Sequence, residues 1–291
     1  MGPEYLIMRS DREVEIIQKA YLYACSKDVE VIKPGNVNID YSHIDTSAYD
    51  FLRSAHDSCR SLFKKNFTLG ERIYHSVIDS RKNTDVNTNL GIIILTAPIV
   101  HSLIHSTKNT FRSSLKDVIK KSRLSDTELL CKAINFVNPG GLGEKDDMNT
   151  HSLPRVTLGE IMDKSAYYDR LSYQYSTGYS DILDFVVPRI VEHKKNIENT
   201  DFLLSLVFLE ILCEIPDTHI SRKFNEKIAK KTSNEARDLI KIINTERSRK
   251  KALSRICQLD YEYKNKGINP GTTADLLVSS VMIERLLCFD F

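Results

Sequence analysis

Three observations on the sequence predict an all-α protein with a single domain. Apolar residues recur at helical spacing through almost all of the 291 residues. No segment alternates as a half-buried strand does, and no pair of segments carries a hairpin signal. No internal repeat or low-complexity linker divides the chain. We therefore expect one globular helical domain over residues 1–291, with roughly ten to thirteen helices at typical helix and loop lengths.

The first half of the chain shows helix starts and apolar stripes. Ser10 and Glu13 form a capping box, and apolar residues then follow at helical spacing over 14–24. A second stripe covers residues 51–63. Two further capping pairs predict helix starts near the middle of the chain: Ser125 with Glu128, and Thr157 with Glu160.

The second half contains the expected centre of the domain. The segment DFLLSLVFLEILCEI, residues 201–215, is apolar nearly all round, which predicts a central buried helix. The last helix is expected from about Thr273 to Leu287. Four prolines stand where one helical pattern stops and the next begins: Pro34, Pro139, Pro216 and Pro270.

Composition excludes several classes of protein. Apolar residues make up 41% and charged residues 27%, as in an ordinary globular protein, and the net charge of +2 gives no global field towards nucleic acid or membrane. The N-terminus does not read as a signal peptide, and the longest apolar run, Leu90 to Ile104, is too short and interrupted to span a bilayer. The six cysteines form no CxxC pair, so we expect reduced thiols and a cytoplasmic protein.

Two features favour other functions, and each has a plainer interpretation. Residues 219–255 hold twelve Lys and Arg against four Asp and Glu, which suits nucleic acid but is more often a solvated helical face. Nucleic-acid binding is therefore a minor alternative. His101 and His105 have the i, i+4 spacing of a zinc pair, but Ser102 replaces the Glu of HExxH and no third ligand is evident.

The helix junctions at the four prolines carry the chemically dense residues, and loops on a helical scaffold are natural places for a site. In KPGNVN, Lys33, Gly35 and Asn36 could cradle a phosphate or a sugar. The plainer interpretation is a Pro-Gly turn whose asparagines tolerate left-handed backbone. Taken alone, this motif favours the turn.

The stretch NTNLG places polar residues directly before the long apolar run. Amides are poor helix formers and are costly to bury unpaired, so they either cap a helix or bind a polar ligand. In the second case Asn87, Thr88 and Asn89 would bind a polar ligand such as a ribose or a phosphate, and Gly91 would leave room for it.

The stretch NPGGLGEKDD combines three glycines with carboxylates. Gly140, Gly141 and Gly143 could wrap phosphates with their N–H groups, and Glu144 could hold Mg²⁺. It lacks the ending of a P-loop and no strand precedes it, so a plain surface loop is the stronger interpretation from this motif alone.

Two helix starts complete the set. In PDTHISRK, Asp217 is placed to cap a helix, while Thr218, Arg222 and Lys223 could add a helix N-terminus and cations for an anionic ligand. In NPGTTADLL, Gly271 and Asp275 fall at the first turn of the last helix, where an acidic residue also compensates the helix dipole. Asp217 and Asp275 are thus explained without function as well.

The order of these motifs resembles the triphosphoribosyl-dephospho-CoA synthase family, and the archaeal-type members in particular, whose pattern reads KPGNV, NTNLG, GGxGE and PDTxIxRK. The likeness runs from about Val29 to Leu287. It implies an all-α transferase that uses ATP with Mg²⁺ and joins C1′ of the ATP ribose to the 2′-hydroxyl of dephospho-CoA, with adenine as the leaving group. Such a glycosyl transfer needs a positive pocket for the triphosphate and carboxylates near an oxocarbenium-like centre.

Within this resemblance we predict that Glu30, Asp217 and Asp275 converge as catalytic carboxylates and that they hold Mg²⁺ together with Glu144, with Lys33 and Arg222 outside them. The citrate-lyase enzymes carry NTHKG where this chain has NTNLG, so the acceptor stays open between dephospho-CoA and a related cofactor precursor. A nucleotide-binding protein without turnover is a further alternative. A homodimer is compatible with the sequence, which does not fix the oligomeric state.

Overall fold

The structure is a computed structural model in which residues 9–39, 47–83, 88–105, 110–138, 155–287 and 289 are described. These residues form fourteen α-helices and one π-helix, and they contain no β-strand, which confirms the predicted fold class. The helices are α1 (Asp11–Glu30), α2 (Ala48–Leu62), α3 (Leu69–Ser80), α4 (Leu90–Ile104), α5 (Phe111–Lys120), α6 (Leu124–Val137), α7 (Leu158–Ser165), α8 (Arg170–Thr177), η1 (Asp181–Val186), α9 (Val187–Lys194), α10 (Thr200–Glu214), α11 (Thr218–Lys223), α12 (Glu226–Thr245), α13 (Arg249–Asn265) and α14 (Gly271–Leu286).

Helix starts follow the capping patterns closely, with one exception. Ser10 with Glu13 and Thr157 with Glu160 form complete capping boxes, as predicted. The expected cap at Ser125 is wrong, because α6 begins one residue earlier, at Leu124. Asp126 closes that start instead, since its carboxylate accepts a hydrogen bond from the backbone N–H of Arg123 at 2.7 Å.

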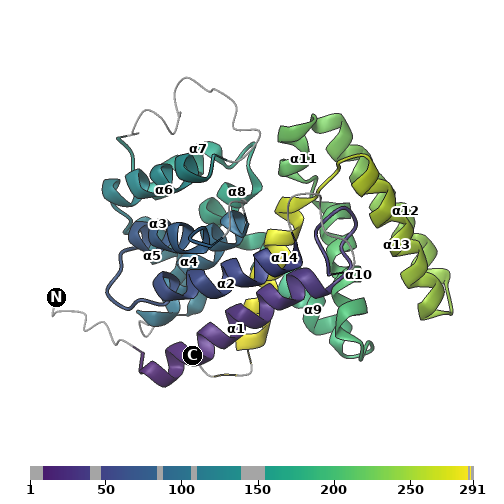
Figure 1. Cartoon of the computed structure of the whole chain (residues 1–291), viewed down its shortest axis with the longest axis horizontal. Helices are drawn as coiled ribbons and strands as arrows, with labels where there is room; N and C mark the ends of the chain where they lie inside the picture. Colours follow the sequence, from purple (N-terminus) through teal and green to yellow (C-terminus); the bar gives the residue numbers. More distant parts are fainter. Residues whose placement is uncertain are drawn as a thin grey trace.

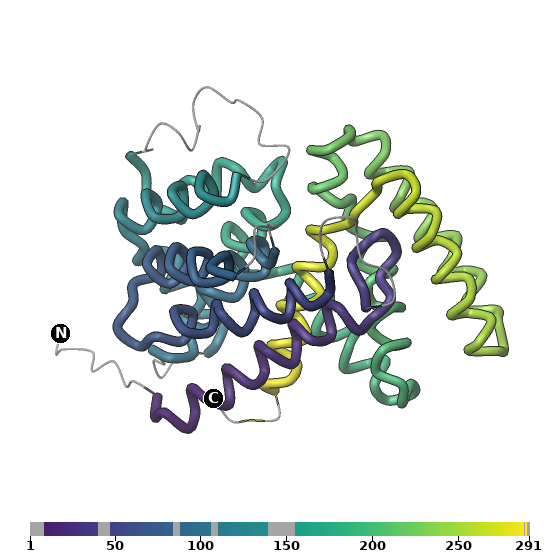
Figure 2. The backbone as a smooth tube through the Cα atoms, viewed as in Figure 1, coloured from purple at the N-terminus to yellow at the C-terminus, as the bar shows by residue number. Residues whose placement is uncertain are grey.

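The helices form two groups with α14 between them (Figures 1 and 2). Helices α3 to α8 lie on one side, and α10 to α13 lie on the other (Figure 1). Helix α10 is buried almost all round, as its sequence predicted. Helix α14 is at least as central, because it packs against α1, α4, α8, α9, α10, α11 and η1. The first turn of α14 is therefore surrounded by other helices, and this arrangement builds the candidate site.

Helix α4 carries a proline in its interior, and two tyrosines compensate for it. Pro98 has no N–H, so the carbonyl of Ile94 loses its helical partner. The buried hydroxyl of Tyr175 donates to that carbonyl at 2.6 Å, and the hydroxyl of Tyr179 donates to the next one, Leu95, at 2.7 Å. The end of α8 and the residues that follow it are thereby fixed to α4.

The histidine pair on α4 lies beside a buried cation. The rings of His101 and His105 are 4.5 Å apart, and Arg72 is fully buried next to them. Its guanidinium donates to the carbonyl of Lys64 at 3.0 Å and also to that of Leu62, at the end of α2. Burial, with help from this positive charge, lowers the pKa of His101 to about 2 and lowers that of His105. A guanidinium in this position disfavours a second cation, so the structure gives no support to a zinc pair.

Four of the cysteines with described side chains, Cys25, Cys59, Cys131 and Cys213, are buried thiols that form no disulfide. Cys257 is an exposed thiol. No helix in the described part of the chain is both long enough and apolar enough to cross a membrane.

Candidate functional site

The first turn of α14 receives its cap from a distant residue. The helix starts after Pro270, which offers no side-chain acceptor. Asp217 supplies one, because its Oδ2 accepts hydrogen bonds from both the backbone N–H and the hydroxyl of Thr273, each at 2.8 Å. Its Oδ1 caps α11 through the N–H of Ile220 at 2.9 Å. Asp217 is buried and both of its oxygens are occupied, so it holds two helix starts together rather than presenting a carboxylate to a ligand.

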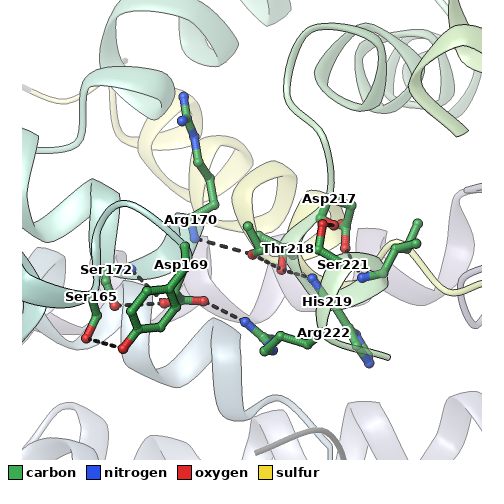
Figure 3. Close-up of polar contacts among 12 residues, drawn as sticks. Ser165, Asp169, Arg170, Ser172, Asp217, Thr218, His219, Ser221 and Arg222 are labelled. Carbon is green, nitrogen blue, oxygen red and sulfur yellow. Dashed lines mark hydrogen bonds and ion pairs between the residues drawn. The ribbon is translucent and has the colours of Figure 1, made fainter. Parts of the chain in front are cut away.

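The starts of α8 and α11 meet α14 through a chain of polar contacts (Figure 3). The backbone N–H of Arg170 donates to the hydroxyl of Thr218 at 3.3 Å, and that hydroxyl lies 3.1 Å from the hydroxyl of Thr272. The backbone N–H of His219 also donates to Thr272, at 3.2 Å. Thr218, predicted to bind substrate, therefore joins the N-termini of three helices.

An ion pair closes the other side of this junction. Arg222 donates to Asp169 Oδ1 at 2.7 Å, and the Oδ2 atom of the same carboxylate caps α8 through the N–H of Ser172 at 2.9 Å (Figure 3). Arg222 keeps about a third of its side chain exposed, so it can still face an anion at the surface. Lys223 points away to the carbonyl of Gly267, at 3.0 Å.

One face of α14 brings together a histidine and a carboxylate. Gly271 and Asp275 are four residues apart and share this face. The imidazole of His219 lies against Gly271, since a Cβ there would be 2.3 Å from Nδ1. The carboxylate of Asp275 lies against Gly91 of α4. Gly91 was predicted to leave room for a ligand and Gly271 to contact one, but these two side chains fill the space beside both glycines.

The electrostatic environment of this face is unusual. Burial raises the pKa of Asp275 well above its ordinary value, and the carboxylates of Asp28, Asp217 and Asp169 raise it further against the opposing effect of Arg222. Burial also lowers the pKa of His219, although the nearby Asp217 opposes this. The imidazole is therefore neutral near pH 7, while the carboxylates leave an excess of negative charge.

The end of α1 contributes Asp28 rather than the predicted Glu30. Asp28 is buried and close enough to Asp275 to affect its pKa. Glu30 is exposed and bonds to Lys27 at 2.5 Å, outside the junction. Lys33 is fully buried, with its ammonium 2.9 Å from Asp28 Oδ1 and 2.7 Å from Asn36 Oδ1. The predicted phosphate-binding role of Lys33 is thus replaced by a role in holding Asp28.

The other residues of the KPGN loop also form hydrogen bonds within the chain. Gly35 has a φ of 82°, and its N–H donates to Asp260 Oδ1 at 2.8 Å. A Cβ at Gly35 would lie 2.4 Å from the carbonyl oxygen of Ile268, so only glycine fits. The amide of Asn36 donates to Asn269 Oδ1 at 2.9 Å. The loop therefore fixes the segment that leads into α14, as the Pro-Gly turn interpretation allowed.

The NTNLG stretch is partly described. Asn89 adopts left-handed backbone with a φ of 62°, and its side-chain amide donates to the carbonyl of Phe51 at 2.8 Å. The NH₂ group of Asn89 is therefore hydrogen-bonded to α2 and is not available to a ligand. The hydroxyl of Thr88 is buried and has no hydrogen-bond partner within the described chain. Asn87, Gly140, Gly141, Gly143 and Glu144 lie outside the described residues.

The structure brings together two of the three carboxylates that were predicted to converge. Asp217 and Asp275 do meet, although Glu30 is replaced by Asp28, and Asp169 and His219 were missed. Their sequence signals were present, since Asp169 precedes a helix and His219 lies inside PDTHISRK. Within the described ranges, no three His, Cys, Asp or Glu side chains are grouped closely enough to hold a metal by themselves.

Comparison with known proteins defines the class as an all-α transferase. The model of the ATP:dephospho-CoA triphosphoribosyl transferase family matches residues 14–289, and the chain belongs to this family. A search among curated proteins gives no match. A crystal structure described as a triphosphoribosyl-dephospho-CoA synthase from Archaeoglobus fulgidus is similar at 17% identity and a TM-score of 0.63, covering 80% of this chain and 97% of that one. The two proteins share a fold.

Proposed function

We propose that the protein transfers the triphosphoribosyl group of ATP to a hydroxyl of dephospho-CoA and releases adenine. In this reaction the bond from C1′ to the adenine nitrogen breaks, and a bond from C1′ to the acceptor oxygen forms. Adenine leaves with the electron pair of the broken bond, and the acceptor hydroxyl loses its proton. The family supplies the reaction type, and the face of α14 supplies groups suited to each step.

The triphosphate is proposed to bind where the helix starts meet. Backbone N–H groups and the helix dipoles of α4, α8 and α14 favour an anion there. Arg222, partly exposed beside Asp169, supports this with a positive charge. It is the one predicted phosphate-binding cation in the described chain that we retain, because Lys33 is buried on Asp28 and Lys223 points to Gly267.

Mg²⁺ is proposed to bind with the triphosphate at Asp28 and Asp275. Mg²⁺ in nucleotide enzymes needs only one or two protein carboxylates, because phosphates and waters complete its shell. Burial raises the pKa of Asp275, and the carboxylates of Asp28, Asp217 and Asp169 raise it further. A divalent cation would relieve this repulsion and neutralise charge on the phosphates. Asp217 does not fit as a ligand, since its two oxygens already accept three hydrogen bonds.

His219 is proposed as the base that takes the proton of the acceptor hydroxyl. A neutral imidazole is required for this, and burial keeps the pKa of His219 low. Its ring packs against Gly271, which lies one helical turn before Asp275 on α14. The observation that carries the proposal is that a neutral imidazole and a buried carboxylate are both placed at the first turn of α14, where helix N-termini meet.

The test is chromatographic detection of adenine from ATP and Mg²⁺, with and without dephospho-CoA. Adenine that appears only with dephospho-CoA, together with a product of the combined mass, supports the proposal. Adenine released with another cofactor precursor but not with dephospho-CoA would favour the related acceptor that the NTNLG variation leaves open. Binding of ATP with no release of adenine, whichever acceptor is added, would favour a nucleotide-binding protein without turnover.

We also propose a cytoplasmic location, because a reducing compartment keeps thiols such as Cys25, Cys59, Cys131 and Cys213 out of disulfides.

A further inference from the structure

A cationic side chain is buried between α3 and α4 without an acidic partner. The side chain of Arg72 has no exposed surface. No carboxylate forms an ion pair with it in the residues that the structure describes, and burial alone lowers its pKa, to about 9, which leaves it charged near pH 7. Arginine is almost never fully buried unless it is paired, because a charge loses its hydration there. The charge of Arg72 therefore calls for a negative partner that these residues do not supply.

The end of α2 accounts for only part of this side chain. The two terminal nitrogens of Arg72 donate to the carbonyls of Leu62 and Lys64, so the guanidinium caps α2, and this is the plainer reason for its position. A helix C-terminus carries only about half a negative charge, which does not balance a full positive one. The Nε atom of Arg72 is buried and has no hydrogen-bond partner in the described segments. The guanidinium thus has both charge and one donor left over.

Three more buried polar atoms near Arg72 have no hydrogen-bond partner among the described residues: Ser76 Oγ, His101 Nδ1 and His105 Nε2. Ser76 lies one turn after Arg72 on α3, has no exposed surface, and faces inward where α3 packs against α4. The two imidazole rings are 4.5 Å apart, and burial together with the charge of Arg72 lowers the pKa of both. A hydroxyl and an imidazole N–H can each donate to an anion. The two helices therefore carry four candidate donors.

Two neighbouring cations are already paired, so they do not need this anion. Lys65, which follows one of the carbonyls that Arg72 binds, lies 2.7 Å from Asp11. Arg9, whose backbone N–H donates to the last turn of α4, lies 2.7 Å from Glu13. Both histidines are neutral near pH 7, because their pKa values are lowered. One negative charge balances Arg72, whereas a divalent anion would leave excess charge in the interior.

We propose that Arg72, Ser76, His101 and His105 bind a small monovalent anion of the chloride type. A water molecule would satisfy the unpartnered atoms but would leave the charge of Arg72 unbalanced. This site is separate from the candidate functional site and does not depend on the proposed function. Gly91 marks the functional site at the start of α4, and His101 lies ten residues further on, about 15 Å along the helix. The anion would stabilise the packing of α2, α3 and α4.

The test measures urea denaturation at neutral pH in sodium chloride and in sodium gluconate of equal ionic strength. An anion that binds only the folded state stabilises it by linkage, so the midpoint should rise with chloride concentration and not with gluconate. Arg72→Gln should abolish this difference. The matched control is Lys64→Gln, which removes the same charge at an exposed position and keeps the carbonyl that Arg72 binds. The control should keep the difference between the two salts.

Ser76→Ala keeps every charge and tests the site even if Arg72→Gln does not fold. It should weaken the apparent affinity for chloride by about tenfold, because a hydrogen bond to a charged group is lost. Crystals soaked in sodium bromide should show an anomalous peak within hydrogen-bond reach of Arg72 Nε. Equal midpoints in chloride and gluconate for the parent protein, an unchanged affinity in Ser76→Ala, or water alone beside Arg72 Nε would each overturn the proposal.

Discussion

The carboxylate of Asp275 fills the space that Gly91 leaves at the first turn of α4. A Cβ at position 91 would lie 2.0 Å from Asp275 Oδ2 and 2.5 Å from Cγ. Helix α4 has no side-chain cap hydrogen bond, and Asn89 at its cap position donates its amide to the carbonyl of Phe51. Asp275 therefore places a carboxyl group beside a first helical turn that contains no acidic residue.

Gly91→Ala should displace Asp275 and abolish most of the transferase activity. The new methyl group cannot coexist with the carboxylate, and a displacement of about 1 Å at a reacting centre costs about a hundredfold in rate. Overpacking of this kind should also lower the free energy of unfolding by about 1–3 kcal/mol. Steady-state kinetics and urea denaturation measure the two effects.

Gly159→Ala is the matched control for Gly91→Ala. Gly159 is also the second residue of a helix that starts with Leu-Gly, but a Cβ there meets nothing closer than 3.4 Å. The substitution should leave activity unchanged and alter stability by less than about 1 kcal/mol. A similar loss of activity in both variants would show that the contact between Asp275 and Gly91 is not the cause.

Asp217→Asn should destabilise the protein. If Asp217 capped only one helix, asparagine could replace it with little change in stability. An asparagine can still accept from Ile220, but its NH₂ group would face the N–H and hydroxyl of Thr273. Loss of these buried contacts should cost about 1–3 kcal/mol in urea denaturation. The exposed Asp238→Asn serves as the control, and an equal midpoint for both variants would contradict the role assigned to Asp217.

Tyr175→Phe should cost about 1–3 kcal/mol, because it leaves the carbonyl of Ile94 buried without a donor. The cost should be smaller in a Pro98→Ala background, where the backbone N–H of residue 98 can reach that carbonyl. A double-mutant cycle by chemical denaturation measures the difference. Equal costs in both backgrounds would exclude compensation of the proline by Tyr175.

The buried histidines predict a loss of stability in mild acid. The folded protein keeps His101 neutral down to a pKa of about 2, whereas the unfolded chain takes up a proton near pH 6.5. Stability should therefore be unaffected by this group above pH 6.5 and fall below it, by up to about 1.4 kcal/mol per pH unit. His101→Gln should reduce the slope of the free energy of unfolding against pH, between pH 6.5 and 5, by about one proton. An unchanged slope would contradict a buried, neutral His101.

The fold was predictable because local signals and burial agree along the chain. Capping and periodicity alone predicted the helix that Ser10 caps and the buried helix around Leu206. The start of α6 was missed because Asp126 bonds both to Arg123 and to Gly70 of α3, a tertiary contact that no local pattern contains.

The site was less predictable, because its geometry depends on contacts between distant segments. Asp217 looked like a candidate ligand, but its second oxygen is taken by Thr273, 56 residues away. Lys33 looked like a phosphate ligand, but Asp28 neutralises it inside the protein. Gly91 and Gly271 were predicted to face a ligand, but periodicity could not show that Asp275 and His219 pack against them.

The most direct test of the central claim is adenine release from ATP, Mg²⁺ and dephospho-CoA by the parent protein, by Asp275→Asn and by His219→Gln, with the melting temperature of each variant measured in parallel. The parent should release one adenine per triphosphoribosyl-dephospho-CoA formed. Both variants should lose at least about a hundredfold in activity, with melting temperatures near that of the parent. Full activity in either variant, or release of ADP in place of adenine, would contradict the proposed reaction.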